Sequence, residues 1–135
     1  MKIERFEEVE AWQLARELTR MVYALTKKTG FAKDVELKSQ IRDAAGSAMH
    51  NVAEGFDSET NVEFIRFLRY AKRSCSEVQS ELCVALDEKY IADAEFKSVY
   101  EQARKTRAAA RGFINYLRKY EARKTSRPEP ARSNR

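Results

Sequence analysis

Two heptad repeats, separated by a short break, constrain the fold of this 135-residue chain most strongly. In each repeat the apolar residues recur at alternating spacings of three and four, so they form one continuous stripe along a helix. The first repeat is Phe64, Leu68, Ala71, Cys75, Val78, Leu82 and Ala85, and the second is Phe96, Val99, Ala103, Thr106, Ala110, Phe113, Leu117 and Tyr120. A period of 3.5 residues kept over this length predicts two long helices with left-handed packing at about 20°.

The N-terminal half carries two further helical patterns. One apolar seam consists of Ala11, Leu14, Leu18, Met21 and Leu25, and we expect its helix to end at Gly30. A second pattern begins near Asp34 and has a core face made mostly of Ala, so partner helices can approach it closely. Gly55 is expected to close this helix in the left-handed conformation that ends many helices.

These patterns together predict an all-α, up-and-down antiparallel four-helix bundle with left-handed packing, formed by residues 1–124. Its helices are expected at about 7–29, 34–54, 61–90 and 94–124. A capping box is predicted at the start of the third helix, with Thr60 as the cap and Glu63 reaching back to it. Residues 125–135 contain two prolines and no apolar residue larger than Ala, so we expect a disordered basic tail.

The net charge of +5 comes from the C-terminal end of the chain. Residues 118–135 contain seven Lys and Arg against Glu121 and Glu129, whereas the remaining 117 residues carry 19 charges of each sign. The basic character is therefore expected in the tail and at the end of the fourth helix, and not in the bundle as a whole.

Several features indicate a protein of the cytoplasm. No apolar run approaches the roughly 18 residues needed to cross a membrane, and the start MKIERFEEVE is too acidic for a signal peptide. Cys75 and Cys83 are eight residues apart on one predicted helix, about 12 Å along its axis, so they cannot form a disulfide with each other. We expect both to be buried free thiols.

No pattern in the sequence predicts an enzyme, a cofactor site or a metal site. The single His50 has no motif around it, and no set of His, Cys and carboxylate residues has the spacing of a zinc site. A Gly-rich phosphate loop and a nucleophile elbow are also missing from the sequence. His50 is therefore expected at the surface or in a subunit contact.

A polar stripe follows one side of the Ala-rich second helix. It consists of Gln40, Ser47, Asn51 and Glu54. Small polar side chains beside an Ala-rich face are typical of a close, hydrogen-bonded contact between helices or subunits, so we interpret the stripe as a structural polar network. A ligand site formed by Asn51 and Glu54 is the alternative that the sequence leaves open.

One group of motifs resembles a known family. The run Ala53-Glu54-Gly55, preceded by Asn51, is its most specific part, and the others are Glu63-Phe64, Phe67-Leu68, Ala71, Ser74 and Glu77. With these motifs the chain, from about Phe6 to about Tyr120, resembles the four-helix-bundle proteins encoded in intervening sequences of bacterial 23S ribosomal RNA genes. It is more distantly similar to the accessory proteins of diversity-generating retroelements.

The resemblance implies a cytosolic helical bundle, usually a homopentamer, without an established enzymatic activity. Self-association is also expected from the residues themselves. The apolar face of the first helix and the Ala-rich second helix offer more surface than three partner helices can cover.

Basic residues on the third and fourth helices suggest contact with RNA or DNA. Arg66, Arg69 and Arg73 share one face of the third helix, with Tyr70 between them. The candidate nucleic-acid-binding residues are Arg66, Arg69, Tyr70, Arg73, Arg111, Arg118, Lys119, Arg123 and Lys124. Phosphate contacts by such residues would depend on salt and hardly on base sequence.

Two hypotheses of function therefore stay open. In the first, the chain is a non-enzymatic oligomer that associates with RNA or DNA as an accessory factor. In the second, it is an oligomeric protein-interaction scaffold, and the basic residues form only a solvated surface.

Overall fold

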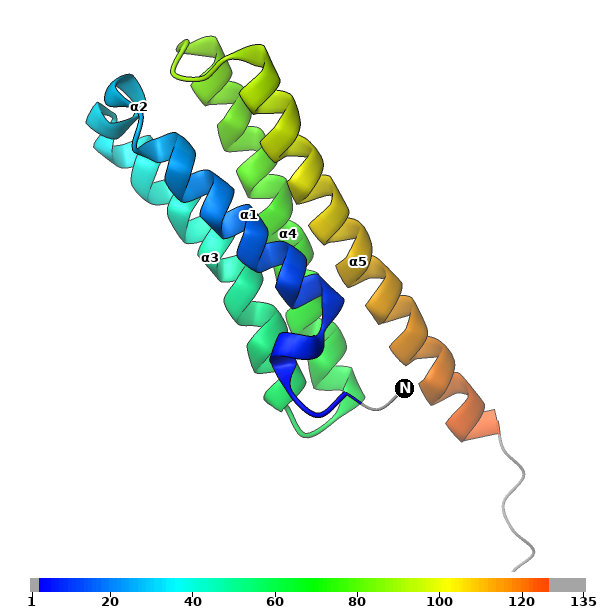
Figure 1. Cartoon of the computed structure of the whole chain (residues 1–135). Helices are drawn as coiled ribbons and strands as arrows, with labels where there is room; N and C mark the ends of the chain where they lie inside the picture. The colour runs from blue at the N-terminus through cyan, green and yellow to red at the C-terminus, as the bar shows by residue number, and fades with distance from the viewer. Residues whose placement is uncertain (1–2, 127–135) are drawn as a thin grey trace, which may run out of the picture.

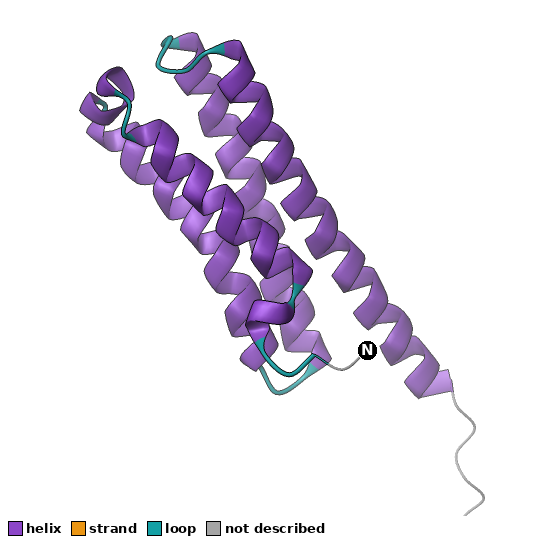
Figure 2. Ribbon diagram, viewed as in Figure 1, coloured by secondary structure: helices purple, strands orange, loops and turns teal. Residues whose placement is uncertain are grey.

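The computed structural model describes residues 3–126 and shows four long helices packed side by side (Figure 1). The long helices are α1 (Glu10–Thr26), α3 (Val35–Asp57), α4 (Asn61–Asp87) and α5 (Asp93–Ser126). Two short helices accompany them, the 3₁₀-helix η1 (Phe6–Glu8) and α2 (Thr29–Lys33). Figure 2 shows helices and connecting loops, and no strand occurs between residues 3 and 126. The predicted all-α fold with four long helices is confirmed.

The helices run up and down in sequence order around a common core. α1 packs against α3 and α5, and α4 packs against the same two helices, so α1 and α4 lie diagonally across the bundle. The start of α1, the end of α3, the start of α4 and the end of α5 lie at one pole (Figure 1). α5 continues beyond the other helices at this pole.

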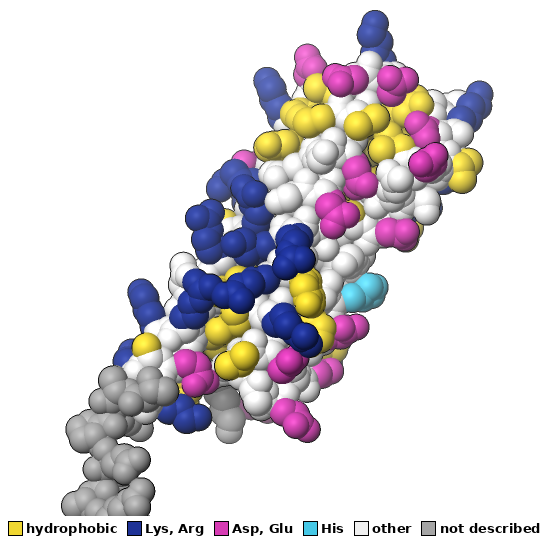
Figure 3. All heavy atoms as spheres, turned by 180° about the vertical axis from the view of Figure 1, so that it is seen from behind, with side chains coloured by type: hydrophobic (Ala, Val, Ile, Leu, Met, Phe, Trp, Pro, Cys, Tyr) yellow, Lys and Arg dark blue, Asp and Glu magenta, His cyan; other side chains and the backbone are white. Residues whose placement is uncertain are grey.

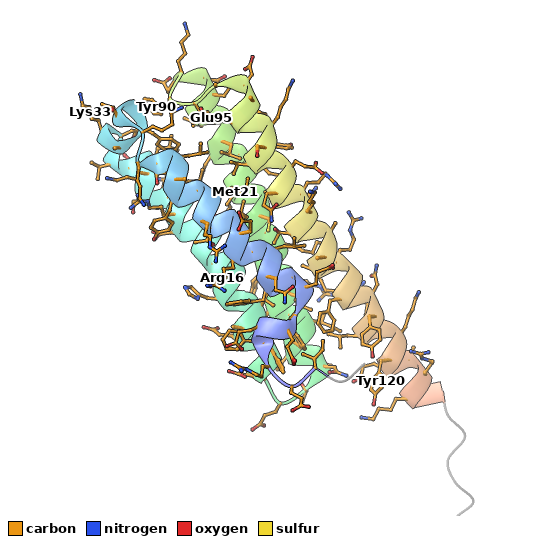
Figure 4. All side chains as sticks on the ribbon, viewed as in Figure 1. Arg16, Met21, Lys33, Tyr90, Glu95 and Tyr120 are labelled. Carbon is orange, nitrogen blue, oxygen red and sulfur yellow. The ribbon has the colours of Figure 1, made fainter. Side chains whose placement is uncertain are left out.

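The two predicted heptad stripes form much of the core. Six members of the first stripe are buried: Leu68, Ala71, Cys75, Val78, Leu82 and Ala85. In the second stripe Val99, Ala103, Thr106, Ala110 and Leu117 are buried, whereas Tyr120 is 47% exposed. Tyr120 lies near the C-terminal end of α5 (Figure 4), one residue before Glu121, whose carboxylate accepts a hydrogen bond from Asn61 at the start of α4. The left-handed packing inferred from the period stays a prediction.

The predicted first helix, 7–29, is wrong at both ends. Extended backbone at Val9 separates η1 from α1, and α1 ends at Thr26. The buried Thr26 hydroxyl donates to the carbonyl oxygens of Val22 and Tyr23 in the last turn of the helix. The chain then turns and buries Phe31 completely.

Gly30 does not stop a helix, because it lies inside α2. This short helix carries Phe31 into the core, where its ring stacks on that of Tyr90 at 5.4 Å between centroids. The Tyr90 hydroxyl donates to Asp34, the N-cap of α3, at 2.9 Å (Figure 4). The pole opposite the end of α5 is therefore joined by side chains of α2, α3 and the loop after α4.

The expectation that Gly55 ends the second long helix is also wrong. α3 continues to Asp57, and no glycine in the described range has a positive φ. Gly55 is buried against α4, where an added Cβ would lie 2.7 Å from Cδ1 of Phe64 and 2.9 Å from Cβ of Phe67. Glycine is needed here because α4 approaches the backbone of α3 closely.

The start of α4 confirms half of the predicted capping box. The Thr60 hydroxyl oxygen accepts a hydrogen bond from the backbone N–H of Glu63 at 3.1 Å. The Glu63 carboxylate pairs instead with Arg66 at 2.8 Å, and no hydrogen bond joins it to the Thr60 backbone within the described chain.

The last two predicted helices, 61–90 and 94–124, differ from α4 and α5 mainly at their C-terminal ends, and α5 begins one residue earlier, at Asp93. α4 ends at Asp87 and not at residue 90, because the backbone of Lys89 enters the left-handed region at a φ of 60°. α5 continues to Ser126, two residues beyond the predicted end. The rest of the predicted tail, 127–135, lies outside the described residues.

Candidate nucleic-acid interface

Lys and Arg side chains gather on one side of the bundle, over α4 and α5. Figure 3 shows them from behind, concentrated toward the half that contains the end of α5. We define the basic face as Arg66, Arg69, Lys72 and Arg73 of α4 together with Arg107 and Arg111 of α5. The face spans two helices that run in opposite directions.

The sequence of each helix explains why the charge collects in one half. In α4, residues 61–76 carry four Lys and Arg against Glu63 alone, whereas residues 77–87 carry three acids and no cation. In α5, residues 102–126 carry eight Lys and Arg against Glu121 alone. Since the first half of α4 lies beside the second half of α5, the two basic segments adjoin.

One hydrogen bond joins the two helices within the basic face. Nη1 of Arg107 donates to the hydroxyl of Ser76 at 3.2 Å. This contact holds the Arg107 side chain across the boundary between α5 and α4, so the cations of the two helices form one surface.

An aromatic residue lies among these cations. Cζ of Arg73 is 5.2 Å from the centre of the Tyr70 ring, and Cζ of Arg66 is 6.0 Å from it. The Phe67 ring meets Tyr70 edge to face at 6.1 Å. Cation–π attraction therefore holds guanidinium groups beside a partly exposed aromatic pair.

Few of these cations are neutralised by acids. Arg66 pairs with Glu63. Within residues 3–126, Arg69, Arg73 and Arg111 are exposed and form no ion pair. The face therefore presents open positive charge that phosphate groups can approach.

Arg104, one turn before the basic face on α5, illustrates the opposite case. Its guanidinium donates two hydrogen bonds to the Glu101 carboxylate, at 2.7 and 2.6 Å. The hydrogen bond and charge of Glu101 raise the pKa of Arg104, and the same contact lowers the pKa of Glu101. The positive charge of Arg104 is therefore largely neutralised by the Glu101 carboxylate.

The structure brings together five of the predicted nucleic-acid-binding residues: Arg66, Arg69, Tyr70, Arg73 and Arg111. The other four, Arg118, Lys119, Arg123 and Lys124, are exposed near the end of α5, and they extend the basic surface along that helix. Lys72 and Arg107 were not among the candidates. The spacing of three from Arg69 to Lys72 and of four from Arg107 to Arg111 is the signal that would have identified them.

The predicted polar network exists only in part. The Asn51 amide donates to the carbonyl oxygen and the hydroxyl of Ser47, at 2.8 and 3.0 Å. The Ser74 hydroxyl of α4 donates to the Ser47 hydroxyl at 3.1 Å. Gln40 and Glu54 are exposed and make no side-chain hydrogen bond with the described residues. The network therefore connects α3 to α4 through Ser47.

The cysteines and the histidine lie apart from the basic face. Both thiols are free, as predicted, but only Cys75 is buried, and Cys83 is exposed. Burial raises the pKa of Cys75 to about 12, although the Arg107 charge opposes this rise, so the thiol stays protonated. His50 is exposed on α3, in agreement with its predicted surface position.

A different feature separates α1 from the second half of α5. A groove of about 770 Å³ lies between these helices. Its lining includes the small residues Ala108, Ala109 and Gly112, flanked by Leu14 and Tyr116, and we call it the α1/α5 groove. Charged residues border it on both sides, with Glu8 and Glu10 near α1 and with Arg104 and Lys105 on α5.

Within residues 3–126 no three His, Cys, Asp or Glu side chains are arranged to hold a metal ion. None of the helices in that range is both long and apolar enough to cross a membrane.

Comparison with known proteins agrees with the observed helical architecture. The family model described as 23S rRNA-intervening sequence protein matches residues 7–112. This match covers α1 to α4 and more than half of α5, including every residue of the basic face. No curated protein sequence matches the chain. The chain belongs to the family of 23S rRNA-intervening sequence proteins.

Proposed function

We propose that this chain is a non-enzymatic, oligomeric accessory factor that binds RNA or DNA through the basic face. The observation that carries the proposal is the open charge of Arg69, Arg73 and Arg111, which have no acidic partner within residues 3–126. A polyanion can pair with these cations without first breaking an ion pair inside the protein.

The shape of the basic face favours a nucleic acid over a small anion. The cations follow the surface of two adjacent helices and do not converge on one point. Such a surface suits an extended phosphate backbone, whose affinity comes largely from the release of counterions. The exposed residues Arg118, Lys119 and Lys124 continue it along α5.

Self-association through the α1/α5 groove is the second part of the proposal. The side chains of Ala108, Ala109 and Gly112 are small enough for another helix to approach closely. An added Cβ at Gly112 would meet no atom within 4 Å, so this stretch of α5 has open space beside it. Tyr116, at the border of the groove, is 54% exposed and offers apolar surface to a second copy of the chain.

The two surfaces extend from α5 toward different neighbouring helices. The groove faces α1, whereas Arg107 reaches toward α4. A closed oligomer, which we take to be a pentamer, can therefore bury the groove and leave each basic face open. Several basic faces on one oligomer would raise the overall affinity for nucleic acid, even where each single contact is weak.

The alternative function is an oligomeric protein-interaction scaffold that does not bind nucleic acid. The α1/α5 groove favours it, because apolar grooves of this kind also accept helices of other proteins. In both cases we place the protein in the cytoplasm, where thiols such as Cys75 and Cys83 stay reduced.

A binding assay separates the two functions. Fluorescence anisotropy of two unrelated labelled RNA strands of about 20 nucleotides, titrated with intact protein at about 50 mM salt, should show binding of similar affinity to both. The affinity should fall steeply as salt increases. Absence of binding at low salt would reject the nucleic-acid function and leave the scaffold.

A further inference from the structure

Tyr70 is a partly exposed aromatic residue at the centre of the basic face. Its hydroxyl forms no hydrogen bond with any of residues 3–126, and its ring belongs to neither of the two core clusters. Tyr90 differs in both respects, because its hydroxyl bonds to Asp34 and its ring packs against the core.

The surroundings of Tyr70 combine two kinds of chemistry. Its ring and that of Phe67 give an aromatic pair that is only partly buried. The guanidinium groups of Arg66 and Arg73 lie beside the Tyr70 ring, and Arg69 lies on the same exposed side of α4. Aromatic rings bind nucleobases by stacking, and guanidinium groups bind phosphates or stack on bases themselves.

Whether its bases are paired or free determines which nucleic acid can contact both the aromatic pair and the cations of the basic face. In a duplex the bases are stacked and paired, so a ring on the flat side of a helix can reach one only after costly unstacking. In a single strand the bases are free to stack on an aromatic side chain, while the cations follow the backbone. A duplex would therefore contact only the cations of the basic face and not the Tyr70 ring.

We infer that the basic face takes single-stranded nucleic acid, with a base stacked on Tyr70 and the adjoining phosphates bound by Arg69 and Arg73. This inference rests on the proposed nucleic-acid function and specifies its ligand. The incoming base displaces the Arg73 guanidinium from the ring, and the guanidinium then pairs with a phosphate. Stacking involves neither the sugar nor the edges of the base, so RNA and DNA strands and different sequences are accepted alike.

The test compares single strands with a duplex. Labelled oligouridine and oligothymidine of 12 nucleotides and a 12-base-pair RNA duplex are titrated with the intact protein and its variants at the same salt. Tyr70→Ala should weaken binding of both single strands about tenfold, since loss of one stacked base has an effect of this size. It should change binding of the duplex less than twofold. Tyr70→Phe, which keeps the ring, should retain single-strand affinity.

Tyr23 offers a matched control. It is 42% exposed, and Cζ of Arg42 lies 4.3 Å from the centre of its ring, so it repeats the cation–π arrangement away from the basic face. Tyr23→Ala should leave the affinity for all three ligands unchanged.

The other outcomes are distinguishable. An equal loss of affinity for duplex and single strands, or no loss with Tyr70→Ala, would overturn the stacking inference and leave the proposed function in place. A loss confined to the RNA strand would assign the contact to the ribose and also overturn it. No binding of any ligand by the intact protein would reject the proposed function itself.

Discussion

Gly55 and Phe64 are in such close contact that residue 55 has no room for a side chain. A Cβ added to Gly55 would lie 2.7 Å from Cδ1 of Phe64. Gly55→Ala should lower the free energy of unfolding by about 1–2 kcal/mol, because overpacking outweighs the helical preference of Ala. Thermal unfolding followed by circular dichroism measures the change.

Gly46 provides the control for this prediction. It lies in the same helix, where an added Cβ would have no neighbour closer than Nε2 of His50 at 3.9 Å. Gly46→Ala should leave stability unchanged or raise it by up to about 1 kcal/mol. If both variants melted at the wild-type temperature, close packing would not explain the glycine at position 55.

The cap of α4 gives a second prediction. Thr60→Ala removes the hydroxyl that accepts from the backbone N–H of Glu63, and it should cost about 1 kcal/mol of stability. Glu63→Ala removes only an exposed ion pair with Arg66, so it should cost less than about 0.5 kcal/mol. Chemical denaturation of both variants compares the two costs, and an equal cost would mean that the Glu63 carboxylate also caps the helix.

The raised pKa of the Glu81 carboxyl group predicts that the stability of the protein depends on pH. Oε1 of Glu81 is buried and has no hydrogen-bond partner among residues 3–126, and the pKa of Glu81 is raised from 4.5 to about 7 by burial and then by the carboxylates of Glu77 and Asp43. Between these two pH values the unfolded chain has lost this proton and the folded chain keeps it. The contribution of Glu81 to stability is therefore lost as pH rises from about 4.5 to about 7.

Glu81→Gln should remove that pH dependence. At pH 8 the variant should be more stable than the wild type by about 1 kcal/mol, a value that allows for screening of a half-exposed carboxyl group by water. At pH 4 the two proteins should differ little. Urea denaturation at both pH values measures this, and the exposed Glu54→Gln is the control. A wild-type advantage at pH 8 would contradict the raised pKa.

The α1/α5 groove gives the prediction for self-association. Ala108→Arg places a long charged side chain in the groove and should lower the oligomer mass measured by light scattering at micromolar concentration. Ala94→Arg makes the same exchange at an exposed position near the start of α5, and it should leave the mass of a closed ring unchanged. A wild-type protein that is monomeric at this concentration would contradict the proposed assembly.

The architecture could be predicted from sequence because it depends on periodicity. The heptad positions from Leu68 to Ala85 are buried, and so are those from Val99 to Leu117 except Phe113, which is partly buried. The predicted helix ends are wrong where tertiary contacts determine the local structure. Phe31 is buried in the short helix α2, and the close contact with Phe64 requires glycine at position 55. Neither contact can be recognised from the neighbouring residues in the sequence.

The candidate site was predictable to a smaller degree. The spacing of Arg66, Arg69 and Arg73 places them on one face of a helix, so the helical period alone was enough to predict this part of the site. The approach of Arg107 to Ser76 depends on how α5 lies against α4, so no spacing within one helix could give it. Within residues 3–126 Arg69 forms no ion pair, and this depends on where the acidic residues of other helices lie, which the sequence alone does not give.

The central claim, that the basic face binds nucleic acid, is tested most directly by the salt dependence of binding. The slope of log Kobs against log salt concentration for a single-stranded RNA is compared between the wild type and the variant Arg69→Gln, Arg73→Gln, Arg111→Gln. A control variant carries Lys27→Gln, Lys33→Gln and Lys97→Gln, three exposed cations outside the basic face. Loss of three phosphate contacts should reduce the slope by about 2 in the first variant, and the control should keep the wild-type slope. Equal slopes for all three proteins would contradict the account.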